Sequence, residues 1–274
     1  MDSIAETVKA HYAGAEENGV TDRVSAVLST LGGDGALSQP LAALDHFHVR
    51  GAEATAELAG LADIQPGWRA LDAGSGLGGP SRYLAATCRC LVEGVDLTPS
   101  FVDVARLLAE REKLADRVHY AVEDATALSF PDGHFDLVWC EHVAMNVADR
   151  AKLYGEFHRV LKSGGILAFY DVVAVEGAEA PTYPLPWSET PATSFLLSRE
   201  ATLAALAGAG FNIRHLKDAS REALDWFQRG VAAGQPGPNL SVVMGPRMAV
   251  MAPNLARNVR EGRLGLLMGV AEAR

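Results

Sequence analysis

From residue 68 onward, short runs of apolar and β-branched residues alternate with longer amphipathic segments. This alternation is typical of β-α-β units, in which helices join parallel strands and cover the sheet. The first five predicted strands span 68–73, 90–97, 118–123, 135–140 and 165–173. Helices are expected to start near Gly79, Pro99 and Asp149. The pattern therefore predicts an α/β protein with a largely parallel sheet.

Two of these helices have clear start signals. Thr98 offers a hydroxyl as N-cap, and Pro99 follows at the first helical position, where a missing N–H group is harmless. Asp149 can cap the segment DRAKLYGEFHRVLK, whose apolar residues recur at helical spacing. We expect that helix to continue until the pair Gly164-Gly165.

The remaining segments complete the predicted architecture. Residues 1–60 are expected to form a helical N-terminal cap, interrupted at Gly32-Gly33, and residues 61–274 the main domain. An insertion at about 174–197 contains too many prolines for a helix or a central strand, so it is either a substrate-binding lid or a solvated linker. After it the sequence predicts, in order, a helix (SREATLAALAGAG), a strand (FNIRHLKDAS), a helix (REALDWFQRGVAAG) and a last strand (LGLLMGVAEA).

Composition and charge narrow the class of protein. The chain has 274 residues, a formal net charge of −10, 49% hydrophobic residues and 21% charged residues, as in ordinary globular proteins. Because the basic residues are scattered singly, we expect no nucleic acid as a partner. The start MDSIAETVKA lacks a basic and then apolar leader, and no apolar run reaches the ~18 residues of a membrane span. We therefore expect a cytoplasmic protein without a membrane partner.

The cysteines point to packing more than to chemistry. Cys88, Cys90 and Cys140 are odd in number and lack the spacing of a four-ligand zinc site. A disulfide framework is therefore not expected, and neither is a metal site. Buried thiols of this kind usually act as small apolar core residues.

The sharpest local signal is LDAGSGLGGP at residues 71–80, directly after the first predicted strand. Its glycines allow a tight turn and let backbone N–H groups approach a ligand at a helix N-terminus. The spacing Gly74, Gly76 and Gly79 matches a dinucleotide fingerprint, and Asp96 ends the second strand where an acid binds ribose. The glycines alone leave two ligands open, a nicotinamide dinucleotide and an amino-acid-bearing nucleoside.

Three acids favour the second ligand. Asp72 lies inside the turn, where its charge would oppose a pyrophosphate but hold an ammonium group through water or the loop backbone. Asp96 can accept two ribose hydroxyls, and Asp124 follows the third strand, where it can accept from an adenine amino group. The carboxyl ends of consecutive parallel strands are the edge at which open α/β sheets bind ligands.

These residues resemble class I S-adenosylmethionine-dependent methyltransferases. The resemblance runs from about residue 68 to 220 and rests on LDAGSGLGG, EGVDLT, EDATALSFPDGHFDLVW and EFHRVLKSGGILAFYD. It implies a Rossmann-like, seven-stranded, mostly parallel sheet with helices on both faces, an antiparallel last strand and the helical cap. The cofactor residues implied are Asp72, Gly74, Ser75, Gly76, Asp96, Leu97, Asp124, Ala125 and Cys140.

The chain looks most like the branch that contains quinone C-methyltransferases and sarcosine or dimethylglycine N-methyltransferases. LDHFHVRG at 44–51 and YPLPW at 183–187 resemble the second group. The histidine that acts as a base in some relatives aligns with Met145 or Asn146 here, so that role does not transfer. His142 and Asp171 each lie at the carboxyl end of a predicted strand and are the candidate bases. The alternatives are a hydrogen-bonded core histidine for His142 and a helix cap or loop anchor for Asp171.

The function predicted is methyl transfer from S-adenosylmethionine to a small molecule, with an amine or amino-acid nitrogen slightly preferred. An O- or C-methyltransferase acting on a phenolic, quinone or natural-product ring is the alternative. An NAD-dependent dehydrogenase is less favoured because no Tyr-x-x-x-Lys pair is present, and a non-catalytic S-adenosylmethionine-binding protein also stays open. A homo-oligomer is possible. The predicted substrate-binding residues are Phe47, His48, Asn146, Tyr183 and Trp187.

Overall fold

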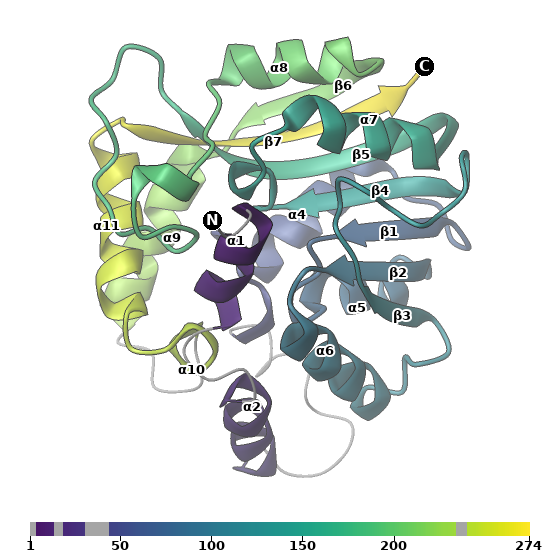
Figure 1. The fold of residues 1–274 in the computed structure, drawn as a ribbon, viewed down its shortest axis with the longest axis horizontal. Helices are drawn as coiled ribbons and strands as arrows, with labels where there is room; N and C mark the ends of the chain where they lie inside the picture. Colours follow the sequence, from purple (N-terminus) through teal and green to yellow (C-terminus); the bar gives the residue numbers. More distant parts are fainter. Residues whose placement is uncertain (1–3, 14–18, 31–43, 234–239) are drawn as a thin grey trace.

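The computed structural model describes residues 4–13, 19–30, 44–233 and 240–274. Within them, seven strands form one sheet in the order β3-β2-β1-β4-β5-β7-β6, with β7 antiparallel to both of its neighbours (Figure 1). The strands are β1 (Arg69–Ala73), β2 (Leu91–Asp96), β3 (Val118–Val122), β4 (Phe135–Glu141), β5 (Leu161–Ala174), β6 (Phe211–Asp218) and β7 (Leu264–Ala273). The predicted fold class, including the antiparallel last strand, is confirmed.

One predicted boundary is wrong. The helix α7 (Arg150–Val160) begins after its Asp149 cap as expected, but it ends at Val160 and not at the glycine pair. Leu161 adopts an extended conformation and already pairs with Phe135 of β4. Pairing with a neighbouring strand thus overrides the helical periodicity of the sequence, which continues through Leu161.

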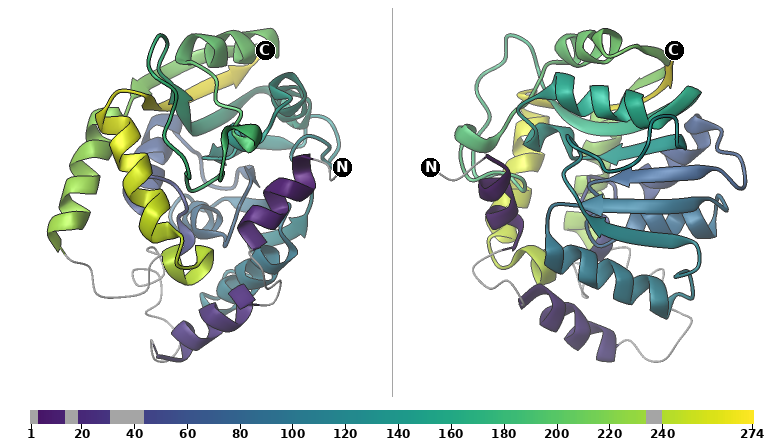
Figure 2. Two further views of the ribbon diagram at one scale, coloured as in Figure 1. Left: turned by 60° about the vertical axis from the view of Figure 1, so that its left-hand side comes forward. Right: turned by 45° about the vertical axis from the view of Figure 1, so that its right-hand side comes forward.

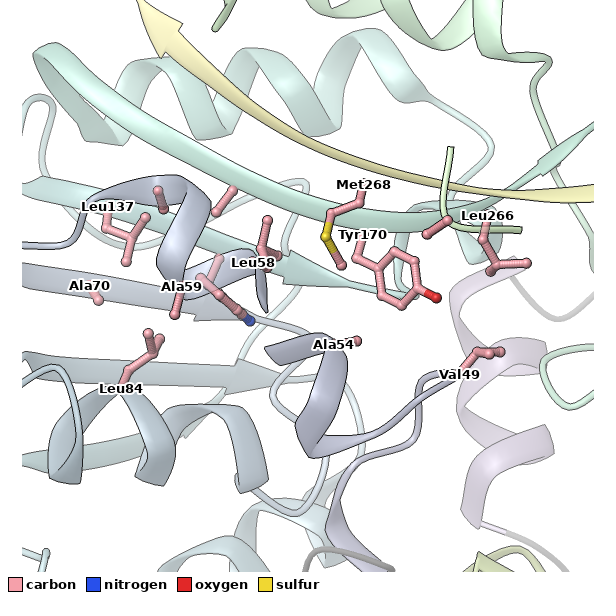
Figure 3. Packing of buried hydrophobic residues seen from close by; sticks show 14 of the residues in the cluster. Val49, Ala54, Leu58, Ala59, Ala70, Leu84, Leu137, Tyr170, Leu266 and Met268 are labelled. Atoms are coloured by element: carbon pink, nitrogen blue, oxygen red, sulfur yellow. The ribbon is translucent and has the colours of Figure 1, made fainter. Parts of the chain in front are cut away.

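Helices cover both faces of the sheet because the side chains of each strand alternate between them. On β4, Leu137 and Trp139 face α4 (Ala52–Ala62), α5 (Gly79–Ala86) and α6 (Pro99–Arg111). Val138 and Cys140 face α7 and α8 (Arg199–Gly208) on the other side. Figure 3 shows how α4 packs against the first face, where Leu58 and Ala59 lie beside the sheet.

A third group of helices lies beyond the carboxyl ends of the parallel strands. It contains α1 (Ile4–Ala13), α2 (Gly19–Thr30), α9 (Ser220–Ala233), α10 (Leu240–Met244) and α11 (Met248–Arg260). Figures 1 and 2 show α9 and α11 side by side at the edge toward which β1 and β4 point. The sequence pattern predicts α1, α2 and α9, but it predicts no helix or strand for residues 240–260. The expected break at Gly32-Gly33 lies outside the described residues.

The proline-rich insertion is a long coil, as the sequence predicts. It leaves β5 after Ala174 and ends at Ser198, whose side chain accepts a hydrogen bond from Ala201 N and caps α8. Trp187 is buried within it and donates from Nε1 to Ser194 Oγ at 2.9 Å. The predicted cap boundary at residue 60 falls inside α4, and the division into a cap and a main domain stays a prediction.

Two further observations concern the part of the chain that the structure describes. Its helices include none that is both long enough and apolar enough to cross a bilayer. Cys88, Cys90 and Cys140 are free thiols, and the last two are buried.

The contact between α4 and the sheet predicts a stability difference between two leucines. Leu58 is fully buried, whereas Leu91 at the start of β2 is 44% exposed. We expect Leu58→Ala to lower the free energy of unfolding by about 2–5 kcal/mol, because it leaves a cavity beside the sheet. Leu91→Ala, removing the same atoms, should cost less than about 1 kcal/mol. Urea unfolding measures both, and equal losses would contradict the packing described.

Candidate functional site

The glycine turn after β1 is fastened to the end of β2. Gly74 and Ser75 both donate from their backbone N–H groups to Val95 O, at 2.8 and 2.9 Å. Gly76 donates its N–H to Asp96 Oδ2 at 3.0 Å. Gly74 has φ +76°, and a Cβ there would lie 2.3 Å from Val143 Cγ2, so only glycine fits. The turn is therefore packed against Val143 and hydrogen-bonded to the end of β2.

Acids end the next two strands at the same edge. Asp96 Oδ1 also accepts from Thr98 N at 2.8 Å, and Asp124 Oδ1 accepts from Thr126 N at 2.8 Å. Burial raises the pKa of Asp96, although the N–H groups of Thr98 and Gly76 oppose that shift. Both carboxylates keep lone pairs for a ligand, because each oxygen can accept more than one hydrogen bond.

A cavity of about 440 Å³ opens at this edge. Six of the predicted cofactor residues line it: Gly74, Gly76, Asp96, Leu97, Asp124 and Ala125. Of the predicted substrate residues, Phe47, His48, Asn146 and Trp187 line it as well. The opposite side is closed by helices α9, α10 and α11. We call the lining residues of these helices the α9–α11 wall: Trp226, Phe227, Met244, Met248, Ala252 and Leu255.

His142 occupies a special backbone position at the cavity. It follows β4 directly, has φ +53°, and donates its backbone N–H to Tyr170 O at 2.7 Å. Its Nε2 is buried and has no hydrogen-bond partner. Burial lowers the pKa of His142 to about 3, so the imidazole is neutral near pH 7.

Glu141, the residue before it, also lines the cavity. Its Oε2 accepts hydrogen bonds from Trp139 Nε1 at 2.9 Å and Thr55 Oγ1 at 3.0 Å. Its Oε1 is buried without a hydrogen-bond partner, 3.4 Å from His48 Nε2. Burial raises the pKa of Glu141 to about 8. Glu141 is not among the site residues predicted from the sequence, although its place at the carboxyl end of a predicted strand is a usable signal.

A second, small cavity lies beneath the glycine turn, with Asp72, Ser75 and Gly76 among its lining residues. Asp72 accepts a hydrogen bond from Ser81 Oγ, and burial raises the pKa of its carboxyl to about 7. Ser75 Oγ is buried and lacks a partner. Two predicted cofactor residues thus lie under the turn and not on the main cavity wall.

Arg82 connects this region to the N-terminal segment. It is buried, donates to Leu77 O at 2.7 Å, and forms ion pairs with Asp45 and Glu112. A Cβ on Gly79 would lie 2.7 Å from Asp45 O, so the segment around Asp45 packs directly on the helix that follows the turn.

Three predicted site residues lie away from both cavities. Cys140 packs in the core on the face covered by α7 and α8, because alternation along β4 turns it away from Glu141. Tyr183 packs half-buried against the other core cluster. Asp171 is buried 4.0 Å from Arg150 Nη1, and burial raises its pKa to about 7, with Arg150 opposing the shift. This placement matches the loop-anchor alternative for Asp171.

Asn146 connects the cavity wall to α1. Its Nδ2 donates to Tyr12 Oη at 3.1 Å, and Tyr12 itself lines the cavity. His11 on the same helix lies 2.9 Å from Pro186 O, next to Trp187. The first helix therefore covers the cavity through contacts with η1 (Ala144–Asn146) and with the insertion. Across the described residues, no three His, Cys, Asp or Glu side chains are grouped to hold a metal ion.

The strand order and the cavity at the carboxyl ends of β1, β2 and β3 define a class I methyltransferase fold. A family profile for a methyltransferase domain matches residues 71–169. Residues 71–169 are therefore similar to methyltransferase domains, and the resemblance described above is confirmed for this segment.

Two curated relatives and one solved structure illustrate the range of this class. The chain is 42% identical over 118 residues to 2-methyl-6-phytyl-1,4-hydroquinone methyltransferase of Synechocystis sp., covering 43% of this chain and 36% of the relative. It is 34% identical over 121 residues to phosphoethanolamine N-methyltransferase of Triticum aestivum, covering 44% and 24%. The matched segments thus span about a third or less of these relatives. The structure of the [4+2]-cyclase SpnF superposes with a TM-score of 0.69 at 24% identity, covering 98% of this chain and 96% of that chain.

The glycine turn predicts a difference between two glycine substitutions. Gly74 and Gly67 both have positive φ, but a Cβ on Gly67 would meet no atom within 4 Å. Gly67→Ala should cost about 1–2 kcal/mol from backbone strain alone. Gly74→Ala should cost about 1–3 kcal/mol more, because its Cβ clashes with Val143. Thermal and urea unfolding measure both, and Val143→Ala should recover part of the loss only in the Gly74→Ala background.

Proposed function

We propose that this protein transfers a methyl group from S-adenosylmethionine to a small-molecule acceptor. The observation that carries the proposal is the continuity of the cavity. The glycine turn, Asp96, Asp124, Glu141 and His142 line it at the strand ends, and the α9–α11 wall lines it from the helices across from them. One space is thus suited to hold a nucleoside and an acceptor next to each other, as a direct transfer requires.

The residues present fit the cofactor. Gly74 and Gly76 line the cavity without side chains of their own, and Ser75 Oγ lacks a partner. Asp96 would accept from ribose hydroxyls and Asp124 from the adenine amino group. Asp72, which lies under the turn, would attract the ammonium group of the cofactor. When bound, S-adenosylmethionine supplies the methyl group as an electrophilic carbon on a sulfonium.

The protein's own contribution is positioning and exclusion of water. Tyr12 and Asn146 hold α1 over the cavity, and Trp187 brings the insertion against it. Covering the site aligns the acceptor with the methyl group and keeps competing water out. His142 is proposed to face the acceptor as a neutral imidazole. Asp171 is proposed to anchor the backbone under η1 in place of a role as base.

The names of the two relatives do not decide the chemical class of the acceptor. One relative is named as a hydroquinone methyltransferase and the other as an N-methyltransferase, so their names allow carbon and nitrogen acceptors. The resemblance of the segments 44–51 and 183–187 favours an amine or amino-acid nitrogen, and the ring acceptor is the alternative.

The other functions are less well supported. A dinucleotide-binding Rossmann sheet has its sixth strand parallel, in the order 3-2-1-4-5-6, whereas β7 here is antiparallel and lies between β5 and β6. A non-methylating role keeps some support, because SpnF shares the fold and is named as a cyclase. A cytoplasmic location and a homo-oligomer stay predictions.

The test of the proposed function is calorimetric titration with S-adenosylhomocysteine. Asp96→Ala should weaken binding about tenfold to a hundredfold, because it removes the ribose acceptor and the partner of the Gly76 N–H group. Asp103→Ala is the control: its carboxyl is exposed on α6 and pairs with Arg106. Absence of binding to the wild-type chain, or equal binding by the Asp96 variant, would refute the proposal.

A further inference from the structure

The α9–α11 wall sets the chemistry of the acceptor side. Its six lining side chains are aromatic, thioether or aliphatic, and none is charged. They come from a part of the chain separate from the cofactor residues, and Figure 1 shows α9 and α11 lying across from the strand ends. Burying the body of an apolar ligand here removes apolar surface from water, which favours binding.

A zwitterionic amino acid fits this wall poorly. Its carboxylate needs a cation, but the two imidazoles at the cavity are neutral: burial lowers the pKa of His142 to about 3 and that of His48 well below its ordinary value. Arg50 pairs with Glu57 through Nη2 at 2.7 Å and is not among the residues that line the cavity. The lining lysines, Lys9 and Lys152, belong to α1 and α7 and not to the wall. A charge placed against the wall would lose its hydration without a replacement.

Glu141 is the acid on the cavity lining that has a free, buried oxygen. Trp139 and Thr55 hold Oε2, which fixes the carboxyl group, and Oε1 has no hydrogen-bond partner. A fixed carboxylate with one free oxygen is the geometry of a proton acceptor. His48, His142 and Tyr170 lie near the Glu141 carboxyl group and are neutral. Asp72 is a further acid nearby, and its charge opposes the ionisation of Glu141.

We propose that the acceptor is a predominantly apolar molecule whose body packs on the α9–α11 wall, and that Glu141 receives the proton lost from its methylated atom. This inference rests on the proposed function. The acceptor atom bonds to the methyl carbon, the carbon–sulfur bond breaks, and its electron pair stays on sulfur. When the acceptor atom is oxygen, the O–H electron pair stays on oxygen; when it is a ring carbon, the C–H electron pair restores the aromatic ring. In both cases the proton passes to the carboxylate of Glu141. An alkylated phenol, an enol or a hydroquinone ring meets these requirements.

The first experiment measures binding of an apolar probe, N-phenyl-1-naphthylamine, by fluorescence with S-adenosylhomocysteine present. The wild-type protein should bind it, and 4-nonylphenol should displace it whereas N,N-dimethylglycine should not. Met248→Glu places a charge on the wall and should weaken probe binding at least tenfold. Val250→Glu is the matched control, since Val250 lies on the same helix and is 55% exposed. Absence of probe binding, equal probe binding by the Met248 variant, or displacement by dimethylglycine would overturn the substrate class.

The second experiment tests Glu141. As pH is raised, the infrared carbonyl band of the protonated Glu141 carboxyl should disappear with an apparent pKa near 8. The band should be missing in Glu141→Gln, whose amide oxygen can still accept hydrogen bonds from Trp139 and Thr55. With 4-nonylphenol, an alkylated hydroquinone or an enol as acceptor, turnover should rise with pH as the Glu141 carboxyl ionises, at or below that range because a bound sulfonium donor lowers its pKa. Glu141→Gln should lower kcat at least a hundredfold and remove that rise, and Glu53→Gln, at a 56% exposed side chain on α4, should change neither.

The outcomes distinguish a failure of the apolar-acceptor proposal from a failure of the proposed function. If the wild-type chain binds S-adenosylhomocysteine but methylates dimethylglycine faster than the phenol, or methylates none of the three apolar acceptors, the apolar acceptor is refuted and cofactor binding stands. Turnover by Glu141→Gln within about threefold of wild type, or an unchanged pH profile, would refute the proton acceptor. Loss of S-adenosylhomocysteine binding in the wild-type chain would instead refute the proposed function.

Discussion

The hydrogen bond from the Gly76 N–H group to the Asp96 carboxylate is the constraint on which the site depends. It joins the turn after β1 to the end of β2, and the bonds from Gly74 and Ser75 to Val95 O repeat that connection. Because both strands are parallel, their ends reach the same edge, and the turn is held open over it. Asp96 thus shapes the turn in addition to any contact with a ligand.

The N-terminal segment depends on the same constraint from the other side. Asp45 pairs with the buried Arg82, which donates to Leu77 O within the glycine-rich sequence. A buried cation without partners would be strongly unfavourable, so Asp45 and Glu112 are needed for the helix after the turn to keep its position. Phe47 and His48 reach the cavity because the residues just before them are fixed in this way.

The sequence predicted the parts of the structure that depend on local patterns. Strand alternation, the Thr98-Pro99 start and the glycine turn are local signals, and the elements they predicted are present. The wall formed by α10 and α11 was missed, because Met244, Met248 and Leu255 carry no motif and Pro253 lies inside the helix. The sequence predicts Cys140 and not Glu141 as a site residue. The position of two adjacent residues in a strand does not show which side chain faces the cavity until the pairing of that strand with its neighbours is known.

Burial gives three acids a common dependence on pH: Glu141 and Asp72, which line the cavities, and Asp171, which lies away from them. The pKa values of Glu141, Asp72 and Asp171 are raised to about 8, 7 and 7, so the folded chain keeps protons that the unfolded chain releases above about pH 4. Their contribution to stability is therefore fully present at low pH and is lost as pH rises through the folded pKa values. A cationic ligand reverses this trend, because it favours the ionised carboxylates and lowers their pKa. Ionised Glu141 and Asp72 thus destabilise the folded protein with an empty site at higher pH. They stabilise the protein when the site holds a positive charge, such as that of a sulfonium donor.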